Sequence, residues 1–150
     1  MSKIAMRRMR ESDLAVVSEL AMLANPHAIK EEYCEGILKE LRQNPNLSFV
    51  AVDDGRVIGY ALSEVHDKKE AVLEDIAVAG HYQKKGIGSL LLNETVKTLK
   101  KSKVKMLFAE VHYKCAAAIP FYYRHGFRIS GFAQDHFGMG HDAIILKLVL

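Results

Sequence analysis

Apolar residues follow two different spacings along this chain, and each spacing predicts one kind of secondary structure. Short apolar or alternating runs predict strands at residues 4–9, 47–53, 56–66, 71–78, 104–112, 127–135 and 142–150. Apolar residues at helical spacing predict helices that begin after Ser12 and after Gly88, and two more over residues 29–43 and 115–125. This order predicts an α/β fold with a mixed central sheet of about six to seven strands, flanked by about four helices.

Polar residues, glycines and prolines mark where these elements end. Ser12 is the expected N-cap of the first helix, and Asn25 with Pro26 is expected to stop that helix. Residues 53–55, Asp-Asp-Gly, lie between two strand patterns and predict a tight hairpin. Gly126 is expected to close the last helix in a left-handed conformation.

The chain has the length and composition of one folded domain. Its 150 residues are 49% apolar and 26% charged, and no apolar run approaches the roughly 20 residues that cross a bilayer. The basic residues near the N-terminus are interrupted by Glu11, Asp13 and Glu19, so we expect no leader peptide there. Cys34 and Cys115 lack the spacing of a metal or redox motif, which fits a reducing compartment. We therefore expect one cytoplasmic domain over residues 1–150, with no membrane partner.

Positive charge is concentrated in one part of the chain. The net charge is only +3, yet residues 84–105 contain seven lysines and a single acid, Glu94. This asymmetry indicates either an anionic partner or a solvated helix face. Few aromatic residues lie among these lysines, and the chain has no aromatic-rich strand motif of the RNA-binding kind, so we expect no nucleic-acid partner.

Residues 83–88 join the end of a predicted strand to the start of a predicted helix. Backbone amides point outward at a helix N-terminus, and glycines let a phosphate approach the main chain closely. A Walker loop does not fit, because Gly86 is followed by Ile87 and Gly88. A dinucleotide fingerprint does not fit either, because Leu91 stands where a third small residue is needed. The third kind of phosphate loop is that of acyl-CoA-dependent N-acetyltransferases.

Gln83, Gly86 and Gly88 match the motif of the GCN5-related N-acetyltransferase (GNAT) superfamily, which is Gln or Arg, two residues, Gly, one residue, then Gly or Ala. Nearly the whole chain follows that superfamily's order of elements, and on this resemblance it is identified as a member. The resemblance implies the GNAT fold and a single N-acetyltransferase domain. It also implies direct transfer of an acetyl group from acetyl-CoA, as cosubstrate, to a primary amine.

The resemblance assigns residues to the binding of acetyl-CoA. In the family, amides of this loop hold the pyrophosphate, the preceding strand end lies beside the pantetheine arm, and the amide matching Val78 polarises the thioester carbonyl. The implied cofactor-binding residues are Ile76, Ala77, Val78, Gln83, Lys84, Lys85, Gly86, Ile87, Gly88, Ser89, Cys115 and Tyr122. Cys115 departs from the pattern, because the related branch usually has an asparagine there. A nucleophilic Cys115 is an alternative chemistry, although the sequence pairs no base with it.

Residues 109–127 most resemble the branch that acetylates protein N-terminal amines, including the bacterial ribosomal-protein alanine acetyltransferases. In that branch the residue matching Glu110 is the base, and the residue matching Tyr122 is the acid. Amine transfer needs such a pair, because an ammonium must lose a proton before it attacks and a departing thiolate is improved by a nearby donor. The alternatives are that Glu110 is a solvated strand end and that Tyr122 is a core tyrosine.

Glu74 and Asp75 form a second pair of carboxylates, inside an apolar strand. Alternation along a strand predicts that their side chains lie on opposite faces. The run 73–75 is also similar to that of polyamine acetyltransferases, in which the residue matching Glu74 helps to bind or deprotonate the amine. The alternative is a buried acid with a structural partner.

The connection before the last strand is expected to contact the acceptor amine. The N-terminal acetyltransferase branch carries a pair of tyrosines in this connection, and His136 and Phe137 occupy those positions here. His136 and His141 are five residues apart and the chain has no HExxH pattern, so we expect no metal.

These residues define the expected function and its alternatives. The expected acceptor is a protein N-terminal or lysine amine. A polyamine or other small amine is the alternative acceptor, and a non-catalytic CoA-binding module is the alternative class. Homodimers are common in the family, so a homodimer is one expected assembly. The strongly apolar residues 143–150 suit an inner strand rather than an exposed edge.

Overall fold

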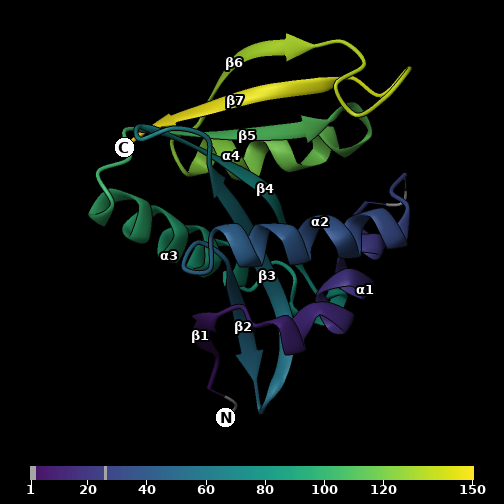
Figure 1. Ribbon diagram of the computed structural model, residues 1–150, viewed down its shortest axis with the longest axis vertical. Coiled ribbons are helices and arrows are strands. Elements are labelled where there is room, and N and C mark those ends of the chain that lie inside the picture. The colour runs from purple at the N-terminus through teal and green to yellow at the C-terminus, as the bar shows by residue number, and fades with distance from the viewer. Residues whose placement is uncertain (1–2, 26) are drawn as a thin grey trace.

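Seven strands form one mixed sheet in the computed structural model, which describes residues 3–25 and 27–150. The strand order is β1-β2-β3-β4-β5-β7-β6 (Figure 1). The strands are β1 (Ala5–Arg8), β2 (Phe49–Asp53), β3 (Arg56–Val65), β4 (Glu70–Val78), β5 (Met106–His112), β6 (Arg128–Ala133) and β7 (Ala143–Val149). The α-helices are α1 (Leu14–Ala24), α2 (Lys30–Gln43), α3 (Ile87–Lys101) and α4 (Ile119–Arg124). Among the described residues, no helix combines the length and the apolar character needed to cross a membrane.

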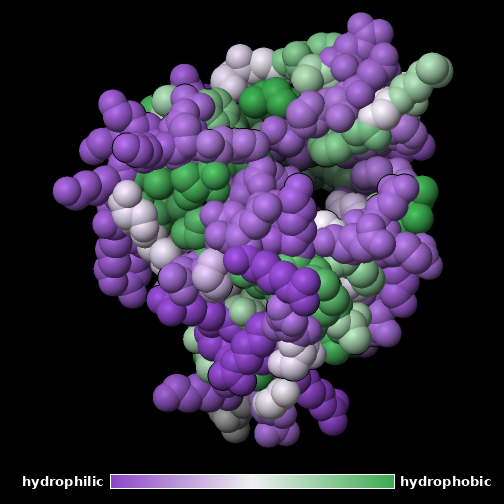
Figure 2. Space-filling model, in the orientation of Figure 1, coloured by the Kyte–Doolittle hydropathy of each residue, from purple (hydrophilic) through white to green (hydrophobic). Residues whose placement is uncertain are grey.

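Helices cover both faces of the sheet. Helices α1 and α2 pack on one face, against residues of β2, β3 and β4, and α3 and α4 pack on the other face. Ile37 and Leu41 of α2 point into the first of these cores, whereas the outer side of α2 is hydrophilic (Figure 2). Leu91 and Leu99 of α3 are fully buried on the second face, where each such side chain stabilises the fold by about 1.5–3 kcal/mol.

Strands β4 and β5 separate partway along their length. They pair in parallel up to Leu73 of β4 and Ala109 of β5. Beyond this point β4 continues beside β3, whereas β5 continues beside β7. Figure 1 shows that β5, β7 and β6 run across the direction of β2 and β3. The two strands thus form a fork beyond Leu73 and Ala109. Glu74 and Glu110 are the first residues past this last pair, so both stand at the opening of the fork.

A bulge in β4 places Glu74 and Asp75 on the same face of the sheet. Leu73 and Asp75 lie opposite the consecutive residues 63 and 62 of β3, so Glu74 is an extra residue in the register. Asp75 bonds Tyr60, and Glu74 lies against Glu64, four residues farther along the same face of β3. The prediction of opposite faces is wrong, because the bulge interrupts the alternation on which it depended.

The predicted order of elements and the predicted fold class are confirmed. The hairpin between β2 and β3 turns at Asp54 and Gly55, with φ values of 47° and 77°, as a type I′ turn requires. Gly126 follows α4 with a φ of 90°. Strand β7 lies between β5 and β6, which confirms the prediction of an inner strand.

The start of α1 differs from the prediction. Ser12 is not its N-cap but lies in a short 3-10 helix, Glu11–Asp13, that leads into α1. The buried Asp13 is the N-cap residue of α1 but makes no side-chain cap for that helix, because its carboxylate accepts a hydrogen bond at 2.8 Å from the amide of Arg10, the N-cap of the 3-10 helix. The same carboxylate pairs with Arg7 at 2.8 Å, and this hydrogen-bonded pair lowers the pKa of Asp13.

The segment predicted as one helix over residues 115–125 consists of two shorter helices. A 3-10 helix over Tyr113–Ala118, distorted at Cys115, precedes α4. Pro120 lies in the first turn of α4, where the amide that it lacks would have no acceptor within the helix. Helix α1 ends at Ala24, and of the two residues expected to stop it, Pro26 lies outside the described residues.

Candidate active site

A cavity of about 670 Å³ opens beside the end of β4. Helices α1, α3 and α4 and the loop between β4 and α3 form its walls. Its lining includes ten of the twelve residues expected to bind acetyl-CoA, namely Ile76, Ala77, Val78, Gln83, Lys84, Gly86, Ile87, Gly88, Ser89 and Tyr122. Lys84 and Arg124 bring positive charge to the lining, whereas Leu20, Leu23 and Phe121 make part of it apolar. This combination suits a long ligand that has both an apolar arm and a phosphate group.

The loop before α3 presents backbone amides to the cavity. Gly86 is the N-cap of α3, and its φ of 84° is a left-handed conformation that glycine adopts readily. The amides of Ile87, Gly88 and Ser89 lie in the first turn, where a helix has no carbonyl to accept their hydrogen bonds. Because the helix dipole adds positive potential at this end, the loop is a suitable anion site.

Gln83 and Gly88 fix this loop against the strand. The side-chain amide of Gln83 donates a hydrogen bond to the carbonyl oxygen of Val78 at 3.0 Å. A Cβ atom on Gly88 would lie 3.3 Å from Cε2 of Phe121 and 4.0 Å from Cγ2 of Val78. A side chain at position 88 would therefore need the ring of Phe121 to shift by a few tenths of an ångström, and position 86 has a backbone conformation that favours glycine.

Tyr122 reaches the cavity from the core. Its side chain is only 6% exposed, and its ring packs edge-on against Phe121 with 5.4 Å between centroids. Burial, and then the nearby charge of Asp75, raise the pKa of Tyr122, so the phenol keeps its proton at neutral pH. Tyr123 is 42% exposed instead. Tyr122 is thus the tyrosine of this pair that can donate a proton into the cavity.

Glu74 and Glu110 face the opening between β4 and β5. Past Leu73 and Ala109 the two strands no longer pair, and the charge of Glu110 contributes to raising the pKa of Glu74. One carboxylate oxygen of Glu110 lies 2.7 Å from Nε2 of His136, in the loop between β6 and β7. The fold therefore brings together three residues that the sequence placed in the catalytic or acceptor site.

Glu74 belongs to a group of carboxylates with Glu64 of β3 and Glu40 of α2. Burial, and then the hydrogen bond with Glu64 and the charge of Glu64, raise the pKa of Glu74 to about 8. Burial and Glu64 likewise raise the pKa of Glu40 to about 7. The side chain of Glu74 is exposed to solvent. Its pKa is therefore raised by protein atoms on one side and by neighbouring like charges, rather than by complete burial. A cationic group that entered this region would lower the pKa of these carboxylates.

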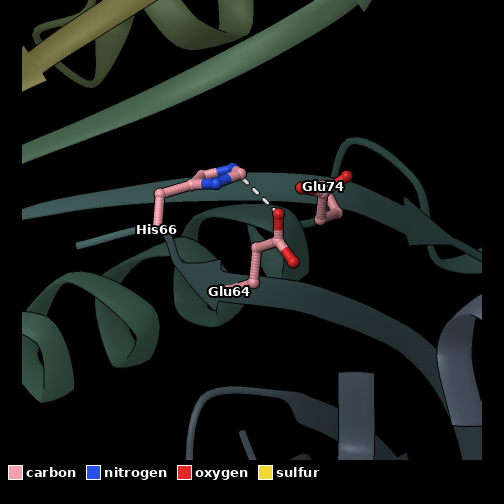
Figure 3. A group of neighbouring side chains, drawn as sticks. All are labelled: Glu64, His66 and Glu74. Atoms are coloured by element: carbon pink, nitrogen blue, oxygen red, sulfur yellow. Dashed lines mark ion pairs between the residues drawn. The ribbon is translucent and has the colours of Figure 1, made fainter. Parts of the chain in front are cut away.

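Glu64, His66 and Glu74 bring three potential metal ligands together (Figure 3). Their ligand atoms lie within 4.8 Å of one another, and Nε2 of His66 is 2.8 Å from Oε1 of Glu64. This group was not predicted from the sequence, where only the spacing of His136 and His141 and the HExxH pattern were considered. The available signal was the two-residue spacing of Glu64 and His66, which puts both on one face of a strand. The expected absence of a metal stays a prediction.

Hydrogen bonds within the protein hold the carboxylate of Asp75 in place. Its carboxylate accepts hydrogen bonds from the side-chain amide of Asn25 at 3.0 Å, from the amide of Ile76 at 2.9 Å and from the hydroxyl of Tyr60. Burial raises the pKa of Asp75 to about 6, and these hydrogen bonds oppose that shift. Asp75 is thus the acid with structural partners that the sequence offered as an alternative, whereas Glu74 faces the open fork.

An aromatic and histidine cluster joins two loops beside the fork. His27, between α1 and α2, stacks on His112 at the end of β5 with 3.9 Å between ring centroids. The amide of Lys114 donates to Nδ1 of His112, so Nε2 of His112 carries the hydrogen that is shared with His141 at 2.9 Å. Phe137 packs on the same cluster, 5.6 Å from His112. This packing holds the predicted acceptor loop in place.

Lys85 and Cys115 lie outside the set of residues that line the cavity. The Nζ of Lys85 lies 5.8 Å from the ring centroid of Tyr82. The sulfur of Cys115 lies 4.0 Å from the carbonyl oxygen of Ala24, on the side of α1. Burial, and then the charge of Asp75, raise the pKa of Cys115, which disfavours the thiolate that a nucleophile would need.

Known proteins resemble this chain in sequence or in fold. [Ribosomal protein bS18]-alanine N-acetyltransferase of Escherichia coli K12 is 33% identical over 105 residues, which cover 68% of this chain and 70% of that protein. The crystal structure of Ard1 from Thermoplasma volcanium matches with a TM-score of 0.88 at 20% identity, over 98% of this chain and 97% of that one. A GNAT family acetyltransferase from Elizabethkingia anophelis with acetyl-CoA bound matches with a TM-score of 0.80 at 22% identity, over 98% of each chain.

The family model described as "Acetyltransferase (GNAT) family" matches residues 10–127. This range contains the phosphate-type loop, both carboxylates of the fork and Tyr122. Since the match covers most of the chain, the protein belongs to the acetyltransferase (GNAT) family.

Proposed function

We propose that this protein transfers an acetyl group from acetyl-CoA directly to the α-amine at a protein N-terminus. The observation that carries the proposal is the fork between β4 and β5. A cavity with a helix N-terminus lies beside the end of β4, and Glu74 and Glu110 stand where the strands part. Two ligands that approached the fork from its two sides would meet there, so an acyl donor and an amine could react without a covalent enzyme intermediate.

The donor side fits acetyl-CoA on three grounds. The loop around Gly86 and Gly88 offers unpaired first-turn amides for a pyrophosphate. Apolar lining from Phe121 and Leu23 suits the pantetheine arm, and the amide of Val78 lies at the end of β4 to polarise the acyl carbonyl. When bound, acetyl-CoA supplies an acetyl group activated as a thioester.

The acceptor amine must first lose a proton, because an ammonium has no lone pair with which to attack. Removal of that proton depends on Glu110, which stands at the fork and can stabilise positive charge. The proton donor for the departing sulfur is Tyr122, whose raised pKa keeps the phenol protonated. The nitrogen loses a second proton after the C–N bond has formed, and this proton replaces the one that Tyr122 gives to the sulfur, so the amide and the thiol are both neutral.

The choice of a protein α-amine rests on the curated relative. That protein is named for acetylating an alanine of ribosomal protein bS18, and alanine has no side-chain nitrogen, so its acetylated nitrogen is an α-amine. A lysine ε-amine differs in carrying its amine on a flexible arm of four methylene groups, and the same fork would accommodate it at greater entropic cost.

One observation favours a second acceptor class, the polyamines. Glu40, Glu64, Glu74 and Glu110 gather four carboxyl groups beside the fork. Burial, and then the hydrogen bond with Glu64 and the repulsion from the charges of Glu64, Glu110 and Glu40, raise the pKa of Glu74 to about 8. A polyamine that placed a second ammonium among these carboxylates would relieve the repulsion. A short neutral peptide would not.

Release of free CoA thiol with a set of amines tests the proposal. We expect turnover with a peptide that begins with alanine, and none when its N-terminus is blocked. Acetyl-CoA binding without turnover by any amine would instead indicate a non-catalytic CoA-binding module. A Glu64→Gln variant separates the acceptor classes, because it should raise the KM of a polyamine and leave that of the peptide nearly unchanged.

A further inference from the structure

Glu110 and His136 form a pair that joins β5 to the loop between β6 and β7. Nε2 of His136 lies 2.7 Å from Oε2 of Glu110, a distance typical of a strong charge-assisted hydrogen bond. Both side chains remain accessible, at 24% for Glu110 and 35% for His136. The pair therefore stands at the fork, where an acceptor amine can reach it.

The direction of this hydrogen bond fixes what His136 can do. An ionised carboxylate only accepts hydrogen bonds, so Nε2 of His136 must carry the hydrogen and donate it. In the neutral imidazole, Nδ1 then holds a lone pair and can accept a proton. A histidine held in this way by a carboxylate has the arrangement of a general base with its orienting partner.

The loop around His136 is tied down by its own hydrogen bonds. The carboxylate of Asp135 accepts from the amide of Gly140 at 2.6 Å, and the amide of Asp135 donates to Asp142 at 2.8 Å. The amide of Phe137 donates to the carbonyl oxygen of His141 at 3.0 Å. The ring of Phe137 also packs edge-on against that of His136, 4.9 Å between centroids. These contacts limit the positions open to the imidazole before any substrate arrives.

We propose that His136 accepts the proton of the acceptor ammonium at Nδ1 and that Glu110 orients the ring and stabilises the resulting imidazolium. The inference rests on the proposed acetyl transfer and names the base for it. The N–H bond of the ammonium breaks as the Nδ1–H bond forms. The freed amine lone pair forms the new C–N bond while the C–S bond breaks, and Tyr122 protonates the departing sulfur. The nitrogen then gives up its second proton, which returns through solvent to the Tyr122 phenolate and leaves a neutral amide. His136 releases the first proton to solvent.

Several charged or titratable groups surround this base. Glu110 on β5 contacts the imidazole, and Glu74 on β4 is a further titratable carboxyl group across the fork. Within the loop, His141 and the acids Asp135 and Asp142 flank the same segment.

The pH dependence of kcat/KM for an alanine-first peptide tests the pair. In the wild type, kcat/KM should fall at acidic pH as the proposed base becomes protonated. In His136→Gln, kcat/KM at neutral pH should fall about 10²-fold and that acidic limb should move or vanish. Added imidazole should restore activity to His136→Ala but not to Glu110→Gln. His81→Gln is the matched control, because His81 is exposed and lies outside the residues that line the cavity.

A purely structural role for His136 predicts different results. His136→Gln would then lose activity with the acidic limb unchanged, and imidazole would restore nothing to His136→Ala. Either result overturns the inference while the proposed transfer stands. If the folded wild-type protein turned over no amine at all, the proposed function would fail and this inference would fail with it. Thermal unfolding of each variant identifies any loss of activity that comes from misfolding.

Discussion

Replacing Gly86 with alanine should weaken acetyl-CoA binding more than it weakens the fold. Gly86 has a φ of 84°, and a Cβ atom there would meet no described atom within 4 Å. The new methyl group would therefore cause backbone strain without a clash in the protein. Strain of this kind costs about 1–2 kcal/mol. The methyl group would also project from the N-cap of α3, beside the amides proposed to hold the pyrophosphate.

Gly55 offers a matched control for the strain alone. It has a φ of 77°, a Cβ atom added there would likewise meet no described atom within 4 Å, and it lies in the β2–β3 hairpin. For a chain of this size, a loss of 1–2 kcal/mol lowers Tm by about 2–8 °C. Gly86→Ala and Gly55→Ala should therefore show similar falls in Tm without ligand.

Acetyl-CoA should separate the two variants in a thermal unfolding assay. At a concentration 100 times its Kd, a ligand stabilises the native state by about 2.7 kcal/mol, and a tenfold weaker Kd at that concentration leaves about 1.4 kcal/mol. Gly55→Ala should keep the full rise in Tm, and Gly86→Ala should lose half of it or more. Equal rises in the two variants would refute the assignment of this loop as the acetyl-CoA site.

Three further predictions concern individual side chains. Tyr122→Phe removes only the proton donor, so kcat should fall about 10²-fold with little change in acceptor KM. The fall in kcat should be smaller with an acyl donor whose thiol is more acidic. An equal fall with both donors would argue against an acid role for Tyr122. The native state raises the pKa of Glu74 to about 8, whereas in the unfolded state this pKa is about 4.5. As pH rises from about 4.5 to 8, the carboxyl group therefore ionises more readily in the unfolded state, and the native state loses stability. Glu74→Gln should therefore gain stability relative to wild type as pH rises through that window, by no more than about 1 kcal/mol because the carboxylate reaches solvent. Denaturant unfolding of both proteins should show a larger stability difference at pH 8.5 than at pH 5. The same difference at both pH values would contradict the prediction. Phe137→Ala should raise the KM of the acceptor and leave that of acetyl-CoA unchanged, and equal changes in both constants would point to a general loss of structure.

Local signals in the sequence were sufficient to predict most of the fold and the loop that borders the cavity. The hairpin at Gly55 and the end of α4 at Gly126 depend on backbone conformations that glycine favours, and these are visible in the residue type. The loop with Gly86 and Gly88 is likewise a local pattern. Its identification needed only a few neighbouring residues, and the cavity lies beside that loop.

The arrangement of the acceptor side of the site could not be predicted in the same way, because it depends on contacts between segments that are distant in the sequence. The bulge that brings Glu74 onto the same face as Asp75 is defined by the register with β3, which a single strand does not encode. The group of Glu64 with Glu74, and the hydrogen bond between Glu110 and His136, join residues 10 and 26 positions apart. The sequence predicted Glu110 and His136 for separate roles, and only the folded chain makes them a pair.

Initial-rate kinetics with both substrates varied test the central claim most directly. Direct transfer across the fork requires acetyl-CoA and an alanine-first peptide to be bound together, so double-reciprocal plots at several fixed peptide concentrations should intersect. Acetylated peptide and free CoA should form in equal amounts. Parallel lines, with labelled acetyl retained on Cys115 after acetyl-CoA alone, would instead show a covalent acyl-enzyme and contradict the account.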